Sequence, residues 1–163
     1  MADTISVARR AWNMSRIRGR DTAPEVAVRS ILHRAGFRFR LHARGLPGRP
    51  DIVLSRYRTT VFVHGCFWHR HEGCRNATTP SSNRGFWQAK LAENVRRDRR
   101  NMEDLRKAGW RVSVVWECDV PHGTSLRRAL RTLERRRMKN RCENITSSLD
   151  FFTDSARRRG ARQ

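Results

Sequence analysis

The sequence lacks any long hydrophobic run. None of its apolar stretches approaches the roughly 20 residues that a membrane-spanning helix requires. Its first residues also lack the apolar stretch of a secretory signal peptide. We therefore expect an intracellular protein with no membrane partner. A length of 163 residues suits a single folded core.

Cysteine is scarce, with four residues in the whole chain. In a reducing compartment these thiols are not expected to pair as disulfides. Three of them, Cys66, Cys74 and Cys118, stand near histidines or at the predicted end of a strand. That placement is typical of metal ligation.

Acidic residues are few beside basic ones: 15 Asp and Glu face 36 Lys and Arg, a formal net charge of +21. A field of this sign selects polyanions, because binding to phosphates releases counterions, and the arginine fork suits phosphate and guanine. Nucleic acid is therefore the expected partner. The alternative is that many of these side chains are only solvated surface.

The charge pattern predicts three segments. Residues 1–24 form a basic arm with little periodicity, residues 25–138 form the folded domain, and residues 139–163 form a polar, arginine-rich and loosely ordered tail. Contacts to a nucleic-acid backbone are assigned to Arg16, Arg18, Arg20 and Arg49.

Helical periodicity predicts a helix that begins after Asp21 or Thr22, has Pro24 in its first turn and ends at Gly36. Its expected inward residues are Val26, Val28, Ile31 and Leu32. A second, long helix is predicted over 85–108, with inward residues Phe86, Leu91, Val95, Met102 and Leu105. A last basic helix is predicted over 124–138.

Alternating and apolar segments predict strands, three of which suit an antiparallel meander: 37–41, 52–54 and 59–63. Residues 110–116 form a further strand, and because a helix precedes it, this strand can lie parallel to an earlier one. The expected fold is therefore α/β with a mixed central sheet flanked by helices.

Asp51 follows Pro50 at the start of a predicted strand, after a glycine-rich turn. There a carboxylate can project beyond the edge of a sheet. Phosphodiester hydrolysis needs charge neutralisation and an activated water, and a divalent cation supplies both. Asp51 is therefore a candidate magnesium ligand, although an Asp after Pro often only caps a turn.

The stretch from His64 to Cys74 holds three histidines and two cysteines, too many to satisfy in an apolar interior. Cys66, His71 and Cys74 are spaced so that one loop can wrap zinc, and Cys118 can complete a tetrahedron. Four protein ligands leave no open position, so this zinc would be structural. Cys142 is left over as a thiol of the tail.

Phe67 and Trp68 lie inside this polar loop, where core packing is not expected. Aromatic wedges can enter a base step, at least cost where pairing is already defective. We therefore expect both side chains to intercalate in DNA. Trp87 is either their companion or a core residue.

His69 lies between the wedge and His71, so a zinc-bound loop could hold it near Asp51. An imidazole of near-neutral pKa can take a proton from the attacking water. His69 is the candidate general base, and His64 is close enough to share that task. The sequence leaves open which ring faces the phosphate.

At these residues the chain resembles the very short patch repair (Vsr) family of DNA mismatch endonucleases, whose fold is a variant of the PD-(D/E)xK restriction-endonuclease core. The resemblance covers about residues 9–138. The motifs that carry it are Asn13-Met14, Asp21-Thr-Ala-Pro-Glu25, Leu46-Pro-Gly-Arg-Pro-Asp51, His64-Gly-Cys-Phe-Trp-His69, Asn94-Val-Arg-Arg-Asp98, Gly109-Trp-Arg-Val and Trp116-Glu-Cys118.

The resemblance implies a catalytic site. Asp51 would be the magnesium carboxylate, the backbone carbonyl of Val63 a second ligand, and His69 the catalytic histidine. Glu25 would anchor water that the metal holds, and Asp98 would orient His69. The number of magnesium ions stays open.

The resemblance also implies a substrate. Phe67, Trp68 and Trp87 would wedge into double-stranded DNA beside a T:G mispair, with the arm in the opposite groove. The product would be a nick 5′ to the thymine, which arises when 5-methylcytosine deaminates. A cytosine-5 DNA methyltransferase and a repair polymerase are the expected functional companions. We expect a monomer associated with the nucleoid in a bacterial cytoplasm.

One departure from the restriction-enzyme pattern matters. The (D/E)-x-K motif is absent, because the corresponding strand ends Val63-His64-Gly65. Vsr enzymes share that absence, which weakens the alternative of a restriction-like endonuclease that cuts both strands of paired DNA. A non-catalytic, zinc-dependent DNA-binding module is the other alternative.

Overall fold

The computed structural model describes residues 6, 8, 9, 12, 19–124 and 126–138. The chain divides into two units, Met1–Arg127 and Arg128–Gln163. The contacts predicted for Arg16 and Arg18, the tail thiol Cys142 and the tail over 139–163 all lie outside the described residues.

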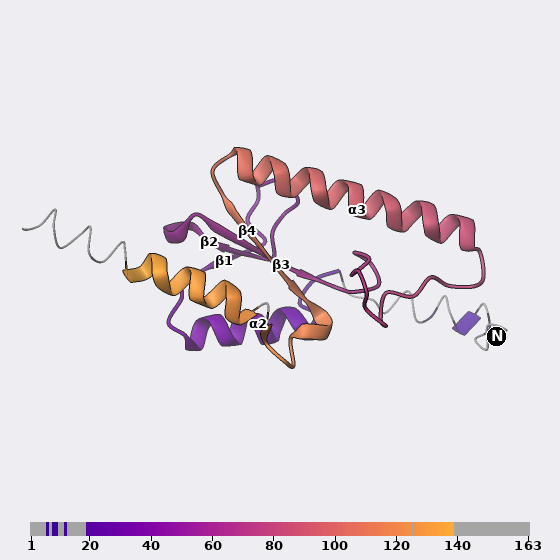
Figure 1. Ribbon diagram of the computed structural model, residues 1–163, viewed down its shortest axis with the longest axis horizontal. Helices are drawn as coiled ribbons and strands as arrows, with labels where there is room; N and C mark the ends of the chain where they lie inside the picture. The colour runs from indigo at the N-terminus through magenta and orange to yellow at the C-terminus, as the bar shows by residue number, and fades with distance from the viewer. Residues whose placement is uncertain (1–5, 7, 10–11, 13–18, 125, 139–163) are drawn as a thin grey trace, which may run out of the picture. The chain divides into compact units, whose positions relative to one another are not determined.

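A four-stranded mixed sheet forms the centre of the first unit (Figure 1). Strands β1 and β2 are antiparallel, as are β2 and β3, whereas β3 and β4 run parallel. The predicted mixed sheet is thereby confirmed. The strands, in their spatial order, are β1 (Arg40–Leu41), β2 (Ile52–Leu54), β3 (Thr59–His64) and β4 (Arg111–Trp116).

The strand register brings several chain segments together at one end of the strands. The parallel pairing of His64 with Trp116 places the ends of β3 and β4 side by side. Because β2 is antiparallel to β3, with Ile52 opposite Val61, the start of β2 lies at that same end. The C-terminal ends of β3 and β4 and the first residue of β2 therefore lie around one site.

The first strand is shorter than predicted. Only Arg40 and Leu41 of the expected 37–41 pair with β2, opposite Val53 and Ile52. Phe37 is instead 1% exposed and packs edge-on against Tyr57 at a centroid distance of 5.5 Å.

Helix α2 (Ala23–Arg34) has Thr22 at its N-cap position and Pro24 in its first turn, as predicted. The chain leaves the helix through Gly36 at φ +79°, a conformation that glycine adopts without strain. Val28 and Leu32 are buried, but Val26 is 51% exposed, so its predicted inward position is wrong. Residues two apart on a helix face opposite ways, and Val26 therefore cannot share the face of Val28.

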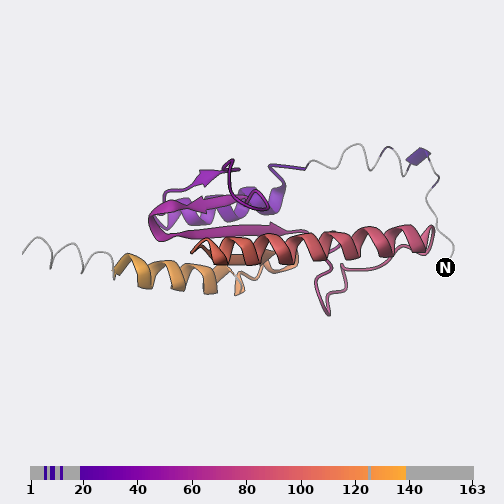
Figure 2. The same cartoon turned by 90° about the horizontal axis from the view of Figure 1, so that it is seen from above.

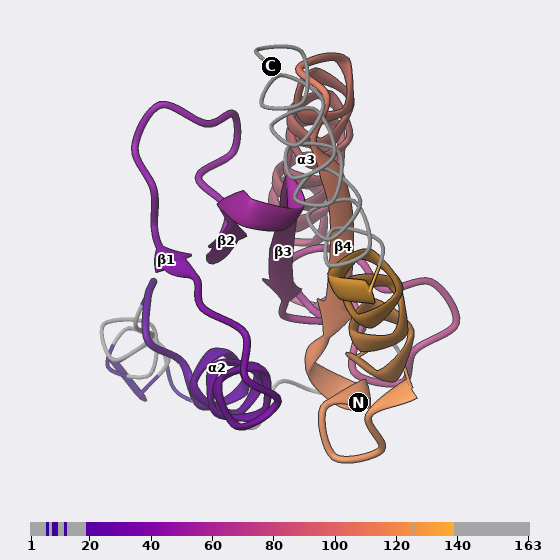
Figure 3. The same cartoon turned by 90° about the vertical axis from the view of Figure 1, so that its left-hand side faces the viewer.

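Helix α3 (Arg84–Lys107) matches the predicted long helix. It lies on one side of the sheet, and α2 lies on the other (Figures 1 and 3). Leu91 and Leu105 are buried as predicted, whereas Phe86 is 52% exposed. The prediction for Phe86 is wrong because the first turns of α3 extend past the strands and have no sheet beneath them (Figure 2).

The core lies between the two helices and the sheet. All three residues of β2 are buried, which is expected of a strand covered on both faces. The main apolar side chains of the core are Val28, Leu32, Ile52, Val53, Leu54, Val61, Leu91, Leu105 and Val115.

Residues 124 and 126–138 are helical, in agreement with the helix predicted over 124–138. Within the described part of the chain, no helix combines the length and the hydropathy needed to cross a membrane.

Candidate active site

A pocket of about 930 Å³ lies at the edge of the sheet where β3 ends and β2 begins. Its walls come from the start of α2, the turn before β2, the end of β3, the loop that follows β3, and the middle of α3. Asp51 and His69 therefore share one pocket, although 18 positions separate them. The lining residues with functional side chains are Thr22, Glu25, Arg49, Asp51, His64, Trp68, His69, Arg97, Asp98, Asn101 and Glu117.

Asp51 is placed by the tight turn before it. Gly48 adopts φ +71°, and a Cβ atom there would lie 2.9 Å from Cβ of Asn101 on α3, so only glycine lets the turn approach the helix this closely. The carboxylate of Asp51 accepts a hydrogen bond from the backbone amide of Val63 through Oδ2, at 2.7 Å.

The charged form of Asp51 is disfavoured in this position. Burial raises the pKa of its carboxyl above the ordinary value, the hydrogen bond from Val63 opposes that shift, and the negative charge of Glu25 adds to it. A carboxylate that is desolvated beside a second carboxylate is a place where a cation would be stabilised.

His69 is held by Asp98, which α3 presents from 29 residues further along the chain. Nδ1 of His69 lies 2.5 Å from Oδ2 of Asp98. Burial raises the pKa of Asp98, but the hydrogen bond and charge of His69 outweigh it and leave the pKa below the ordinary value. This contact is an ion pair whenever the imidazole is protonated.

His64 packs against His69 from the end of β3. The two rings stack with centroids 3.8 Å apart and planes 9° from parallel. His64 is 6% exposed, and its burial, together with the charge of His69, lowers its pKa to about 4. The two histidines that the sequence could not rank therefore differ: His64 is buried, and His69 has a carboxylate partner.

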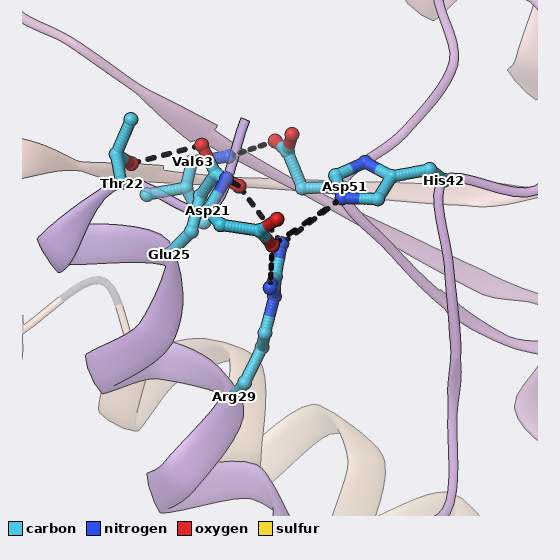
Figure 4. A network of polar contacts seen from close by, with 7 residues as sticks. All are labelled: Asp21, Thr22, Glu25, Arg29, His42, Asp51 and Val63. Carbon is cyan, nitrogen blue, oxygen red and sulfur yellow. Dashed lines mark hydrogen bonds and ion pairs between the residues drawn. The ribbon is translucent and has the colours of Figure 1, made fainter. Parts of the chain in front are cut away.

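Glu25 lies in the first turn of α2 and is 5% exposed. Its Oε1 accepts a hydrogen bond from the hydroxyl of Thr22 at 2.8 Å, and its Oε2 accepts one from the backbone amide of Asp21 at 3.0 Å (Figure 4). Thr22 thus bonds to the carboxylate and makes no side-chain cap hydrogen bond to the helix backbone.

Three cysteines and one histidine meet beside the end of β4. The ligand atoms of Cys66, His71, Cys74 and Cys118 all lie within 4.8 Å of one another. Nδ1 of His71 is 3.6 Å from Sγ of Cys66 and 3.3 Å from Sγ of Cys118. These are the four residues that the spacing predicted, and such a donor set could hold a zinc ion.

The pKa values of the three thiols shift in different directions: a hydrogen bond from the backbone of Asn76 lowers the pKa of Cys74, whereas the pKa values of the other two are raised. Desolvation and the neighbouring cysteines raise the pKa of Cys118 to about 12, and desolvation also raises the pKa of Cys66. A divalent cation at the centre would reverse this, because it stabilises the thiolate forms. The ring of His71 is held by stacking on Trp116, with centroids 4.1 Å apart.

An aromatic cluster adjoins the pocket. The ring of Phe67 lies 5.0 Å from Trp68 and 5.5 Å from Trp87, with all three side chains partly exposed. Asn94 on α3 donates a hydrogen bond to the backbone carbonyl of Trp68 at 3.2 Å, which ties the loop to the helix. The three residues predicted as wedges therefore form one half-buried group, and Trp68 itself lines the pocket.

The arginines predicted to contact the nucleic-acid backbone lie in different places. Arg49 lines the pocket, and Arg20 is exposed before α2. Sequence reasoning missed Arg97 and Asn101, which also line the pocket. A helical repeat on α3 could have found them, because positions 94, 97, 98 and 101 lie along one face.

Comparison with known proteins gives the chain its family. A family model described as "DNA mismatch endonuclease Vsr" matches residues 2–75. The type II nicking enzyme V.XorIIP of Xanthomonas oryzae pv. oryzae is 47% identical over 133 residues, covering 82% of this chain and 97% of that protein. The type II nicking enzyme V.NmeAIP of Neisseria meningitidis is 42% identical over 135 residues, with coverages of 83% and 96%. The DNA mismatch endonuclease Vsr of Escherichia coli is 47% identical over 118 residues, with coverages of 72% and 75%. With this identity over most of its length, the chain belongs to the Vsr family and is a DNA-nicking endonuclease.

Proposed function

We propose that this enzyme nicks duplex DNA 5′ to the thymine of a T:G mispair, in a magnesium-dependent reaction that begins very short patch repair. The observation that carries the proposal is the pocket in which Asp51 and the His69–Asp98 pair meet, beside an aromatic cluster. Residues 25–138 would form the catalytic domain.

The donor set at Asp51 fits a magnesium ion. It consists of hard oxygen donors, and the raised pKa of the Asp51 carboxyl marks a buried negative charge that the protein leaves partly uncompensated. Asp51 and the backbone carbonyl of Val63 would hold the ion. When bound, the cation would neutralise charge at the scissile phosphate and make water more acidic. Glu25 would orient water in the same pocket.

His69 is the proposed general base. A carboxylate only accepts hydrogen bonds, so the neutral imidazole donates Nδ1–H to Asp98 and keeps Nε2 as its proton acceptor. As His69 takes a proton from the attacking water, Asp98 stabilises the positive ring that results. The buried ring of His64 supports His69 by stacking and fixes its plane.

Zinc would hold the site together. Bound by Cys66, His71, Cys74 and Cys118, the ion would join the loop after β3 to the end of β4. His69 lies in that loop, so the same anchor would restrict the position of its imidazole. Four protein ligands suit a structural role.

Nicking of one strand is favoured over cutting of both. The end of β3 carries Val63-His64-Gly65 and so lacks the second acid and the lysine of restriction-type sites. The family membership also argues against a module without catalysis. In this proposal the enzyme acts as a monomer in the bacterial cytoplasm, at sites that a cytosine-5 methyltransferase has modified, and a repair polymerase replaces a short tract.

Strand-specific incision tests the substrate. A duplex with one T:G mispair in a randomised flank is expected to be nicked only on the thymine strand, and only with Mg²⁺ present. The paired T:A and C:G duplexes serve as controls, and the product ends are read on a sequencing gel. Equal rates on paired and mispaired DNA would refute the mismatch claim, and linear products from an intact plasmid would favour a double-strand cutter.

The Trp68→Ala variant tests the wedge. We expect the ratio of affinities for mispaired and paired duplex to fall by about tenfold, since a stacked aromatic contributes on the order of 1–3 kcal/mol. Affinity for paired DNA, which depends on charge, should change little. Both affinities are measured by fluorescence anisotropy in EDTA.

The matched control is Trp110→Ala, which removes a tryptophan before β4, at the end of the strand remote from the pocket, where Arg58 lies over its ring. This variant should leave the ratio unchanged. If Trp68→Ala weakened binding to both duplexes equally, Trp68 would have a packing role only.

A further inference from the structure

Arg29 connects three segments of the chain around Glu25 (Figure 4). It lies one turn after Glu25 on α2, and its side chain is 14% exposed. Its Nη2 donates to Oε2 of Glu25 at 2.8 Å, and its Nη1 pairs with Oδ1 of Asp21. Nη2 also lies 3.2 Å from Nε2 of His42, which must be the acceptor because a guanidinium only donates.

The guanidinium stands where a bound cation could otherwise lie. Asp21, Glu25 and His42 bring their ligand atoms within 4.8 Å of one another, and both Nη atoms of Arg29 are engaged with this group. Its Nε is buried and has no hydrogen-bond partner in the described part of the chain. Among the described residues, the polar contacts of the guanidinium are therefore those with this cluster.

Arg29 provides a positively charged hydrogen-bond donor to the buried carboxylate of Glu25. Its carboxylate is almost fully enclosed and lines the same pocket as Asp51. Two of its donors are a hydroxyl and a backbone amide, and Arg29 is the charged one. A buried carboxylate that loses its charged partner is expected to rotate or to recruit another cation.

We infer that Arg29 is a positioning residue of the nicking reaction: a cation built into the chain that holds the Glu25 carboxylate in place beside Asp51. Asp21 and His42 hold the guanidinium in turn. The inference rests on the role proposed for Glu25. It assigns Arg29 no contact with DNA or with the reacting phosphate.

A double-mutant cycle tests this role. Arg29→Gln is expected to lower the single-turnover nicking rate by about 10-fold to 100-fold, since a small displacement of a catalytic group has costs of this size. In an enzyme that already carries Glu25→Gln, the same change should cost less than about twofold, because the two residues act as one unit. Arg29→Lys keeps the charge but lacks the fork, and should restore part of the rate.

Two further readouts separate positioning from folding. In Arg29→Gln, affinity for the mispaired duplex in EDTA should stay close to that of the parent enzyme. The midpoint of thermal unfolding should fall, because a buried carboxylate loses its charged partner, but the variant should remain folded at the assay temperature. Arg34→Gln is the matched control, because it removes an exposed arginine from the last turn of the same helix. Its nicking rate should equal that of the parent enzyme.

The outcomes are distinguishable. Full losses from Arg29→Gln in both backgrounds, an unchanged rate, or a loss matched by unfolding would each overturn the inference while leaving the proposed site intact. If Asp51→Asn and Glu25→Gln both nicked at the parent rate, the proposed site itself would fail.

Discussion

Asp51→Asn is expected to lower the single-turnover nicking rate by about 10³-fold or more, equivalent to about 4 kcal/mol of transition-state stabilisation at ~1.36 kcal/mol per tenfold. The amide is a weak ligand for a divalent cation and bears no charge. Its oxygen can still accept the hydrogen bond that the Val63 amide now donates to Asp51, so the strand edge should keep its geometry. The loss should therefore appear in chemistry and not in folding.

Binding separates these effects. Affinity of Asp51→Asn for the mispaired duplex in EDTA should equal or exceed that of the parent enzyme, because a negative charge has been removed from a surface that meets phosphates. Glu103→Gln is the matched control: it removes an exposed acid from α3 outside the pocket and should nick normally. If Asp51→Asn nicked at the parent rate, the metal ligand would have to be sought elsewhere.

Cys118→Ala is expected to abolish stoichiometric zinc binding and to reduce the free energy of unfolding by about 4 kcal/mol or more, an effect typical of a lost structural metal. Cys118 is the proposed ligand that would connect the loop after β3 to the end of β4. The three remaining candidate ligands are close together in sequence and could not by themselves fix the loop to the sheet. Elemental analysis and denaturant unfolding give the two readouts.

The nicking rate of Cys118→Ala should fall as well, because His69 lies in the released loop and would no longer be held against Asp98. Cys142→Ser is the control, since four candidate ligands cluster without that thiol. It should keep one zinc per chain and the parent stability. Zinc retained by Cys118→Ala would show that this ligand is wrongly assigned, and a parent enzyme without zinc would refute the site.

The elements of the fold follow from local patterns. Alternation and helical repeats depend on neighbours two to four residues away, so β3, β4, α2 and α3 could be predicted with their directions of pairing. The same reasoning failed where the environment was set by distant segments. Phe86 has a suitable helical position, but its turn of α3 extends beyond the sheet that would have covered it.

The site was predicted in part. The Cys and His residues between 64 and 74 are dense enough in sequence for their chemistry to indicate a metal cluster, and their meeting with Cys118 agrees with that interpretation. The role proposed for Arg29 had no such signal. An arginine among 36 basic residues looks like solvated surface until the structure encloses it beside Glu25.

The sequence by itself determined the order of strands and helices along the chain, the excess of positive charge and the residue types available for catalysis. The tertiary structure decided which of them meet: it brings Asp51 to the amide of Val63 and Arg29 to His42. The contact of Asp98 with His69 agrees with what the family resemblance implied. The physical reason is that side-chain chemistry and local periodicity are properties of short segments. Contacts between distant segments depend on how the strands pair and how the helices pack against the sheet.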